Sequence, residues 1–392
     1  MTAATTAPPA GPVLGLSPEQ EELERAVLQF AVRELAPHAV AWDRQQHFPA
    51  DVLRHAARLG LGGVVVDPDA GGAGLSRLDA VVVFEALATG CPSLAAYVSI
   101  HNMVAAMVDR FGSASQRETH LPALCSMDHF GSYCLTEADA GSDAAALRTT
   151  ALRRGEGWVI DGVKQFVSGA GTSDLYVVMA RTGDAGPSGV TAFLVEAGMA
   201  GLSFGAEEQK MGWRAQPTRQ VVLEGVEVPD EARLGPEGEG FKVAMAGLDG
   251  GRLNIAACSI GGASLALEKA RAHLLDRRAF GRPLADQQAL RFVLADMATE
   301  LEAARLMVRR AATALDAGAA DATQWCAMAK RFATDAGFTV ANQALQLHGG
   351  YGYLAETGIE KIVRDLRVHQ ILEGTNEIMR LIVSRHLLGN PS

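Results

Sequence analysis

Two short runs, Leu175-Tyr176-Val177-Val178-Met179 and Thr191-Ala192-Phe193-Leu194-Val195, identify the middle of this 392-residue chain as a β-sheet region. Both are rich in β-branched and aromatic residues, and clusters of Gly, Asp, Pro and Ser bound them. Similar runs occur nearby at Trp158–Ile160, Phe166–Ser168 and Gln220–Leu223. Their spacing suits an antiparallel sheet or a small barrel, so we predict a β domain over residues 131–233.

Helical patterns precede this β region. Ser17-Pro18-Glu19-Gln20 combines a capping box with Pro at the first helical position, which predicts a helix start. Further helical spacing covers residues 51–59, 77–88, 94–111 and 117–124. The Gly-rich stretch 68–74 lacks both GxGxxG spacing and a GK[ST] ending, so we interpret it as a turn between helices.

Long helices also follow the β region. Apolar residues recur every three or four positions from Leu290 to Leu315, Gly318 ends that run, and a second pattern begins at Trp325. Four helical segments of such length indicate a helical bundle. The sequence therefore predicts an α+β protein with an N-terminal helical domain (1–130), a middle antiparallel β domain (131–233) and a C-terminal four-helix bundle (234–392).

Composition excludes several classes of protein. Hydrophobic content of 48% with 20% charged residues is that of a globular chain, and a net charge of −10 disfavours binding to nucleic acid. The longest apolar runs fall far short of the roughly 20 residues of a membrane span. Five cysteines without a CxxC pair, and ten histidines without ligand spacing, predict no disulfides and no metal. Met1–Gly15 contains no basic residue, so we expect a cytoplasmic location.

Glu373 is the candidate catalytic residue. It follows the apolar Ile371 and Leu372, precedes Gly374, and stands two residues before Thr375, a suitable N-cap for a helix. A carboxylate held on such a turn could act as a base. Alternatively, Glu373 could merely complement the positive end of the helix dipole, which is worth at most about 1 kcal/mol.

Two polar stretches lie within the predicted β domain, one at its beginning and one further along the chain. Tyr133–Asp143 offers hydroxyls and Gly-spaced backbone donors that suit a polar ring edge or phosphate oxygens, although a strand ending in an Asx-type turn would look similar. Gly162–Gly169 places Phe166 two residues before Ser168, and therefore on the same face of a strand. One strand could thus stack a flat ring and bond its rim.

Together with Glu373, these stretches resemble the acyl-CoA dehydrogenase family over nearly the whole chain. The resemblance rests on motifs that occur in the family's order and spacing: Leu135-Thr136-Glu137, Gly141-Ser142-Asp143, Asp161-Gly162 with Lys164, Arg277 with Phe280-Gly281, His348-Gly349-Gly350 and Glu373-Gly374-Thr375. The fold of that family agrees with the three domains predicted above.

The resemblance implies a chemistry. Family members bind FAD, remove the α proton and β hydride of an acyl-CoA thioester, and pass electrons to an electron-transfer flavoprotein. Glu373 matches the base. Some relatives carry their base at the position of Gly251, which cannot act here. Residues 247–256, 295–299, 304–309 and 364–380 resemble members that oxidise isobutyryl-CoA. The alternatives are 2-methylbutyryl-CoA and butyryl-CoA.

The same resemblance implies the ligand contacts, including some to a neighbouring subunit's FAD and hence an oligomer, usually a tetramer. The positions that match cofactor contacts are Tyr133, Leu135, Thr136, Gly141, Ser142, Phe166, Val167, Ser168, Arg277, Phe280, Gln287, Gln288, Gln346, Leu347, Gly349, Gly350, Thr375, Asn376 and Glu377. Those that match acyl-CoA contacts are Ser142, Asp249, Gly250, Gly251, Arg252 and Arg385.

Two departures from the family pattern affect the flavin side. Ala138 and Asp139 replace the usual Pro and Gly, and Phe166 replaces a common Trp, which keeps the stacking surface but removes an N–H donor. Two further alternatives share the fold: an oxygen-using flavin oxidase or monooxygenase, and a non-enzymatic DNA-binding member. The intact Glu373 disfavours both, and the negative charge disfavours the second.

Overall fold

The N-terminal part of the chain is helical, as the sequence predicts. The computed structural model describes residues 15–389, so the stretch 1–14, on which the predicted location depends, lies outside the described residues. Ser17 forms the predicted capping box with Gln20. The helices are α1 (Pro18–Phe30), α2 (Ala39–Gln45), α3 (Ala50–Ala57), α4 (Arg77–Ala88), α5 (Pro92–Phe111) and α6 (Ala114–Cys125).

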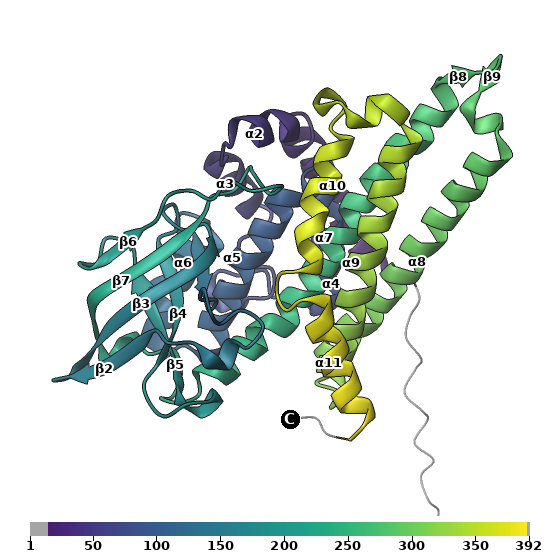
Figure 1. Ribbon diagram of the computed structural model, residues 1–392. Coiled ribbons are helices and arrows are strands. Elements are labelled where there is room, and N and C mark those ends of the chain that lie inside the picture. Colours follow the sequence, from purple (N-terminus) through teal and green to yellow (C-terminus); the bar gives the residue numbers. More distant parts are fainter. Residues whose placement is uncertain (1–14, 390–392) are drawn as a thin grey trace, which may run out of the picture.

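The middle part is a seven-stranded sheet beside α5 and α6 (Figure 1). Its strands are β1 (Gly131–Cys134), β2 (Thr150–Arg154), β3 (Gly157–Ser168), β4 (Leu175–Arg181), β5 (Val190–Glu196), β6 (Leu202–Phe204) and β7 (Thr218–Pro229). The order is β1-β4-β2-β3-β7-β6, with β5 paired to β4. The pairing is mostly antiparallel, as predicted.

One strand pair departs from the antiparallel pattern. β1 runs parallel to β4 over its whole length, and β2 adds a single parallel bridge to β4. A parallel pair needs a long crossover. The segment between β1 and β4 supplies it, because it contains both strands of the β2–β3 hairpin.

Strand β3 contains a bulge beside Phe166. Lys164 pairs with Val221 and Val167 with Arg219, so β3 carries one extra residue between them. Phe166 has φ +56°, in the left-handed region. Exposure still alternates after the bulge, because Phe166 is exposed, Val167 is buried and Ser168 is partly exposed, so the shared strand face of Phe166 and Ser168 stays a prediction. Phe166 itself faces outward at the bulge, with a relative exposure of 63%.

The C-terminal part is helical again. It consists of α7 (Gly240–Asp276), α8 (Gln288–Asp316), α9 (Ala322–Leu347), α10 (Ile359–Arg367) and α11 (Asn376–Leu387). A small hairpin, β8 (Arg278–Ala279) and β9 (Arg282–Pro283), projects where α7 turns into α8 (Figure 1). The helix-to-strand transitions fall near the predicted boundaries, so 1–130, 131–233 and 234–392 stay our proposed domains.

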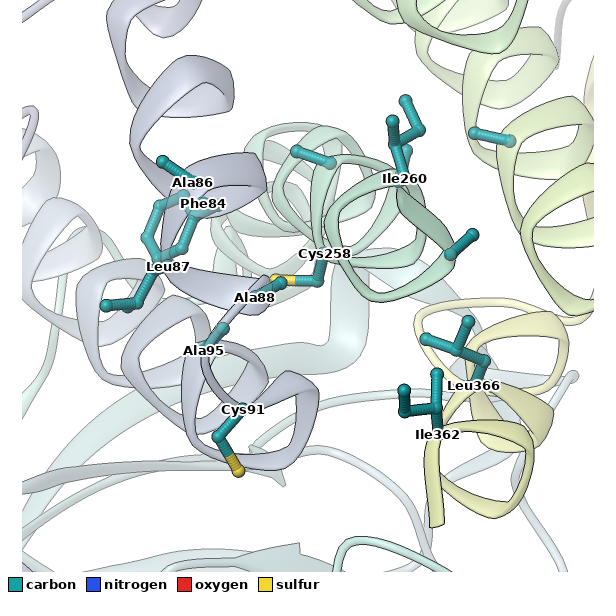
Figure 2. Close-up of a cluster of buried hydrophobic side chains, with 14 of the residues drawn as sticks. Phe84, Ala86, Leu87, Ala88, Cys91, Ala95, Cys258, Ile260, Ile362 and Leu366 are labelled. Carbon is teal, nitrogen blue, oxygen red and sulfur yellow. The ribbon is translucent and has the colours of Figure 1, made fainter. Parts of the chain in front are cut away.

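The helical parts share one apolar core, in which α7 crosses α4 and α10. Figure 2 shows side chains of α4, α5, α7 and α10 converging there, among them Phe84, Cys258 and Leu366. Gly261 permits this close crossing, because a Cβ at that position would lie 2.1 Å from the backbone oxygen of Glu85. The core therefore holds α7 rigidly, and α7 in turn positions the residues of the site.

Residues 15–389 show no sign of a membrane-spanning helix or a metal site. None of their helices combines the length and apolar character that crossing a membrane requires. They hold no cluster of three or more His, Cys, Asp and Glu side chains that could bind a metal ion. All five cysteines are free and buried.

Candidate active site

Glu373 lies on a tight turn between α10 and α11. Its φ of +54° is unusual for a residue with a side chain, and Gly374 follows with φ +90°. Thr375 then caps α11, since its hydroxyl accepts a bond from the backbone N–H of Ile378 at 3.3 Å. The predicted turn and N-cap are therefore confirmed. Left-handed backbone at a non-glycine residue is commonly found where function requires a fixed geometry.

Two cations hold this turn by its backbone. Arg252 Nε donates to the carbonyl of Glu373 at 3.2 Å, and Lys330 Nζ donates to the carbonyl of Gly374 at 2.8 Å. Arg252 is fixed in turn by Asp249, whose other oxygen accepts from Thr323 Oγ1 at 2.7 Å. Bonds from charged donors are stronger than neutral ones. The turn is thus anchored to both α7 and α9.

The carboxylate of Glu373 is buried and has no partner. Neither oxygen forms a hydrogen bond to any described residue. Burial raises the pKa of the Glu373 carboxyl to about 7, although the positive charges of Lys330 and Arg252 oppose this rise. An unpartnered buried carboxylate is costly and rare. Such a group, with a pKa near neutrality, has the properties of a general base.

Gly251 and Tyr133 lie beside this carboxylate. A Cβ placed on Gly251 would lie 2.6 Å from Glu373 Oε2, so the two positions converge on one point. Tyr133 Oη is also buried without a partner. Burial raises the pKa of Tyr133, and the charge of Glu373 raises it further. A glycine at 251 therefore leaves the space that the Glu373 carboxylate occupies.

The loop after β1 is fixed by a buried ion pair. Lys164 Nζ lies 2.7 Å from Glu137 Oε1 and donates to the Leu135 carbonyl at 3.1 Å. Glu137 also accepts the backbone N–H groups of Arg148 and Thr149. The Thr136 carbonyl accepts the N–H of Gln165. The motif residues Glu137 and Lys164 thus hold the loop against β3 and leave the Thr136 side chain partly exposed.

The other predicted flavin contacts in this region differ in exposure. Gly141 and Ser142 are exposed, Ser168 is partly exposed and Val167 is buried. Ala138 and Asp139 are also exposed, and Asp139 forms only a surface ion pair with Arg148 at 3.5 Å. The extra charge of this loop therefore faces solvent.

A second group of predicted cofactor residues lies around a cleft of about 550 Å³ at the far end of α7 and α9. It is lined by Arg277, Gln346, Leu347, Gly349 and Gly350, together with His273, Leu284, Leu290, His348, Tyr351 and Leu354. Phe280 tops the adjoining hairpin with 94% of its side chain exposed. Gln287 and Gln288 start α8 beside it.

The cleft is remote from Glu373. Gly251 lies on α7 and Arg277 directly follows its last residue, Asp276, so the two are roughly 39 Å apart at about 1.5 Å per residue. One dinucleotide cannot reach both places within this chain. The predicted cofactor residues therefore form two separate groups within this chain.

Several residues predicted to contact ligands bond within the chain or lie at its surface. The Asn376 amide points inward and bonds Lys330, Thr334 and Asp335. Glu377 pairs with Arg380 at the surface. Arg385 is exposed on α11, outside the contacts that hold the turn. His348, part of the His348-Gly349-Gly350 motif, bonds the Ala344 carbonyl.

Lys330 was missed by the sequence analysis. The sequence gives little sign of its role. Lys330 falls among the mainly apolar buried residues of α9, but a lysine in a helix usually marks a position exposed to solvent. Its contacts with the turn follow from the packing of α9 against α11, and sequence periodicity does not report that packing.

Sequence models of three domains of one protein family match almost the whole chain. Residues 17–128 match the acyl-CoA dehydrogenase N-terminal domain, 132–226 the middle domain and 238–388 the C-terminal domain. The chain therefore belongs to the acyl-CoA dehydrogenase family. The predicted fold class is confirmed, and membership implies an acyl-CoA substrate and a flavin cofactor.

Particular relatives share most of its length. The chain is 55% identical to the mitochondrial isobutyryl-CoA dehydrogenase of Bos taurus, over 96% of this chain and 91% of the relative. It is 49% identical to the isobutyryl-CoA dehydrogenase of Dictyostelium discoideum, with the same coverage, 96% and 91%.

Solved structures of other proteins have the same fold as this chain. A chain in a structure of the electron transferring flavoprotein of Acidaminococcus fermentans has a TM-score of 0.93 at 37% identity, covering 95% of this chain and 99% of that one. Butyryl-CoA dehydrogenase from Megasphaera elsdenii has a TM-score of 0.92 at 34% identity, with coverage of 95% and 99%.

Proposed function

We propose that this enzyme oxidises isobutyryl-CoA to methacrylyl-CoA, with FAD as cofactor and Glu373 as base. The observation that carries the proposal is the buried, unpartnered carboxylate of Glu373 on a turn anchored by two cations. The identity of 55% to the bovine isobutyryl-CoA dehydrogenase supports the substrate.

The residues of this chain account for half of the reaction. Glu373 takes the α proton, which breaks the α C–H bond and leaves its electron pair to form the double bond. FAD, when bound, would supply the acceptor for the hydride of the β carbon. Tyr133 closes the site beside the carboxylate and helps to exclude water, because it packs against the apolar cluster that lies between the sheet and helices α5, α6 and α7.

The residues present fit a flavin. The loop over 135–142 offers exposed backbone and the hydroxyls of Thr136 and Ser142, and the outward ring of Phe166 offers a stacking surface. The remote cleft at Arg277 would hold the adenosine half of FAD bound mainly by another copy of the chain. That arrangement requires an oligomer, and we propose a tetramer. The exposed tip residue Phe280 supports it.

We further propose an electron-transfer flavoprotein as the acceptor. The support is family membership and the similarity to a solved chain from work on the electron transferring flavoprotein of Acidaminococcus fermentans. A cytoplasmic location stays a prediction from the sequence.

Anaerobic titration of the flavin-loaded enzyme is expected to show flavin bleaching by isobutyryl-CoA that is faster than bleaching by 2-methylbutyryl-CoA or butyryl-CoA. The expected preference rests on the 55% identity to the bovine isobutyryl-CoA dehydrogenase, and bleaching by any of the three requires its α and β carbons to lie between Glu373 and the flavin. Stopped-flow absorbance would measure the rates, and reoxidation by oxygen should be slow.

The control and the contradicting outcomes are distinct. Acetyl-CoA has no β carbon and must leave the flavin oxidised. Faster bleaching by another acyl-CoA would replace the substrate and keep the base. Fast reoxidation by oxygen would favour the oxidase alternative, and no bleaching by any acyl-CoA would refute the proposed reaction.

The rate of flavin reduction is expected to rise with pH through about 7. Only ionised Glu373 can accept a proton, and the pKa of its carboxyl is about 7. The rate should therefore be low at pH 5.5 and approach a plateau above pH 8. Single-turnover reduction in buffers of constant ionic strength would measure this limb, and a flat profile would contradict the assignment of the base.

A further inference from the structure

Lys330 is a buried cation without a counterion. It is fully buried on α9, and its Nζ donates to the Gly374 carbonyl at 2.8 Å and to Asn376 Oδ1 at 3.0 Å. Both acceptors are neutral. Among residues 15–389, no carboxylate oxygen lies within 4.0 Å of this Nζ. By contrast, the other two fully or nearly buried lysines, Lys164 and Lys361, have carboxylates at 2.7 and 2.5 Å.

Such an ammonium needs compensation for its lost hydration. Burial lowers the pKa of Lys330 to about 8, and the charge that most opposes this fall is that of Glu373. The effect is mutual, because Lys330 is also the charge that most lowers the pKa of Glu373. The two groups therefore stabilise each other's ionised forms across the turn.

Other ionisable groups face this pair from neighbouring elements. Arg252 on α7 opposes the charge of Lys330 and supports that of Glu373, while Asp335 and Glu377 favour the charged lysine. Tyr133 and Cys258 are neutral near pH 7, since burial raises the pKa of both. His369 is neutral too, because burial and Lys330 lower its pKa to about 3. Arg252 and Lys330 are thus the cations that act on Glu373.

Lys330 also determines where the base stands. Its bond to the Gly374 carbonyl, together with the bond from Arg252 to the Glu373 carbonyl, fixes two successive peptide groups that have positive φ angles. Asn376 extends this anchor, because its amide bonds both Lys330 and Asp335. Loss of Lys330 would therefore release one end of the turn.

We propose that Lys330 is a positioning residue for the Glu373 base: its ammonium fixes the Gly374 carbonyl and supplies the positive charge that keeps the neighbouring carboxylate ionised. This inference rests on the proposed function, because it assigns Lys330 a role only if Glu373 removes the α proton. Proton abstraction begins from the ionised carboxylate, so the charge of Lys330 keeps the base available at neutral pH.

The test is the pH profile of flavin reduction by isobutyryl-CoA in flavin-loaded K330Q. An opposite charge nearby lowers a carboxyl pKa by about 1 to 3 units, so K330Q should move the acid limb upward by about that amount. At pH 7 the rate should fall about tenfold or more and recover in part at pH 9. K330R keeps the charge and should restore the acid limb to within about half a unit of its original position. K330M, which needs no hydrogen-bond partner, replaces K330Q if that variant fails to fold.

A matched control separates this role from general damage. Lys361 is equally buried but ion-paired with Asp365, away from the turn, so K361Q should lower stability without moving the acid limb. Infrared difference spectra recorded over pH would titrate the Glu373 carboxyl directly, with E373Q identifying its band. That carboxyl should titrate at higher pH in K330Q than in the unsubstituted enzyme.

The outcomes distinguish the two proposals. If E373Q reduces its flavin at the normal rate, the proposed base is wrong. If E373Q is inactive but K330Q keeps both the original acid limb and the original infrared titration, the role of Lys330 is overturned. A rate that falls equally at every pH would also overturn it, since that result indicates only a structural role.

Discussion

Glu373→Gln is expected to slow flavin reduction by isobutyryl-CoA about 10²- to 10⁴-fold while the flavin content stays near normal. The amide has nearly the shape of the carboxylate but cannot accept the α proton. The backbone of residue 373 keeps its bond from Arg252, and Gly374 keeps its bond from Lys330. The turn should therefore retain its geometry, so the loss would report the chemical step.

The same substitution should stabilise the fold at neutral and higher pH. The pKa of Glu373 is raised from 4.5 to about 7, so the folded state favours the protonated form. Stability from this group is fully present below the unfolded pKa and is lost as pH rises through about 7. A Gln does not ionise, so stability is not lost in this way. Between pH 5 and 8, the free energy of unfolding of E373Q should rise by up to about 3 kcal/mol relative to that of the unsubstituted enzyme.

Stopped-flow reduction and thermal unfolding over pH would measure these two effects. E156Q is the control, because Glu156 is exposed in the β2–β3 turn and should change neither quantity. Full activity in E373Q would remove Glu373 as the base. A stability difference that does not change between pH 5 and 8 would show that the carboxyl does not titrate in that range.

The sequence predicted local features of the fold well. Apolar spacing from Leu290 to Leu315 gave α8, and the capping box at Ser17 gave the start of α1, because both signals are set by residues a few positions apart. The parallel pairing of β1 with β4 was not predicted. It depends on contacts between distant segments, and β1 is too short to show a pattern.

In the candidate site, too, features set by neighbouring residues were predicted, whereas those set by contacts between distant segments were not. The Glu373 turn could be predicted, because Gly374 and the N-cap Thr375 are adjacent to it in sequence. The bulge beside Phe166 could not, since it arises from the register of β3 against β7. Lys330 and Lys164 were not recognised as buried, because a lysine in an amphipathic pattern usually marks a solvated face.

Lys164→Met is expected to lower the free energy of unfolding by about 3 to 5 kcal/mol and to reduce the flavin content of the purified protein. The substitution leaves the buried carboxylate of Glu137 without its cation, and the Leu135 carbonyl loses the donor that holds the loop after β1. Glu137 keeps only the two backbone N–H donors of Arg148 and Thr149. That loop carries Thr136, so the proposed flavin contacts should become mobile.

The buried position makes this loss large, and an exposed pair of the same type provides the control. Lys242 pairs with Glu239 at 3.4 Å on the surface of α7, so K242M should cost at most about 1 kcal/mol. In the double variant K164M/E137Q no charge is left uncompensated, so at least half of the lost stability should return. Denaturant unfolding and the ratio of flavin to protein would measure both effects. If K164M and K242M lower the free energy of unfolding equally, the Lys164–Glu137 pair does not hold the loop. Removal of one partner of an ion pair is expected to cost much stability only where the remaining charge is buried away from water.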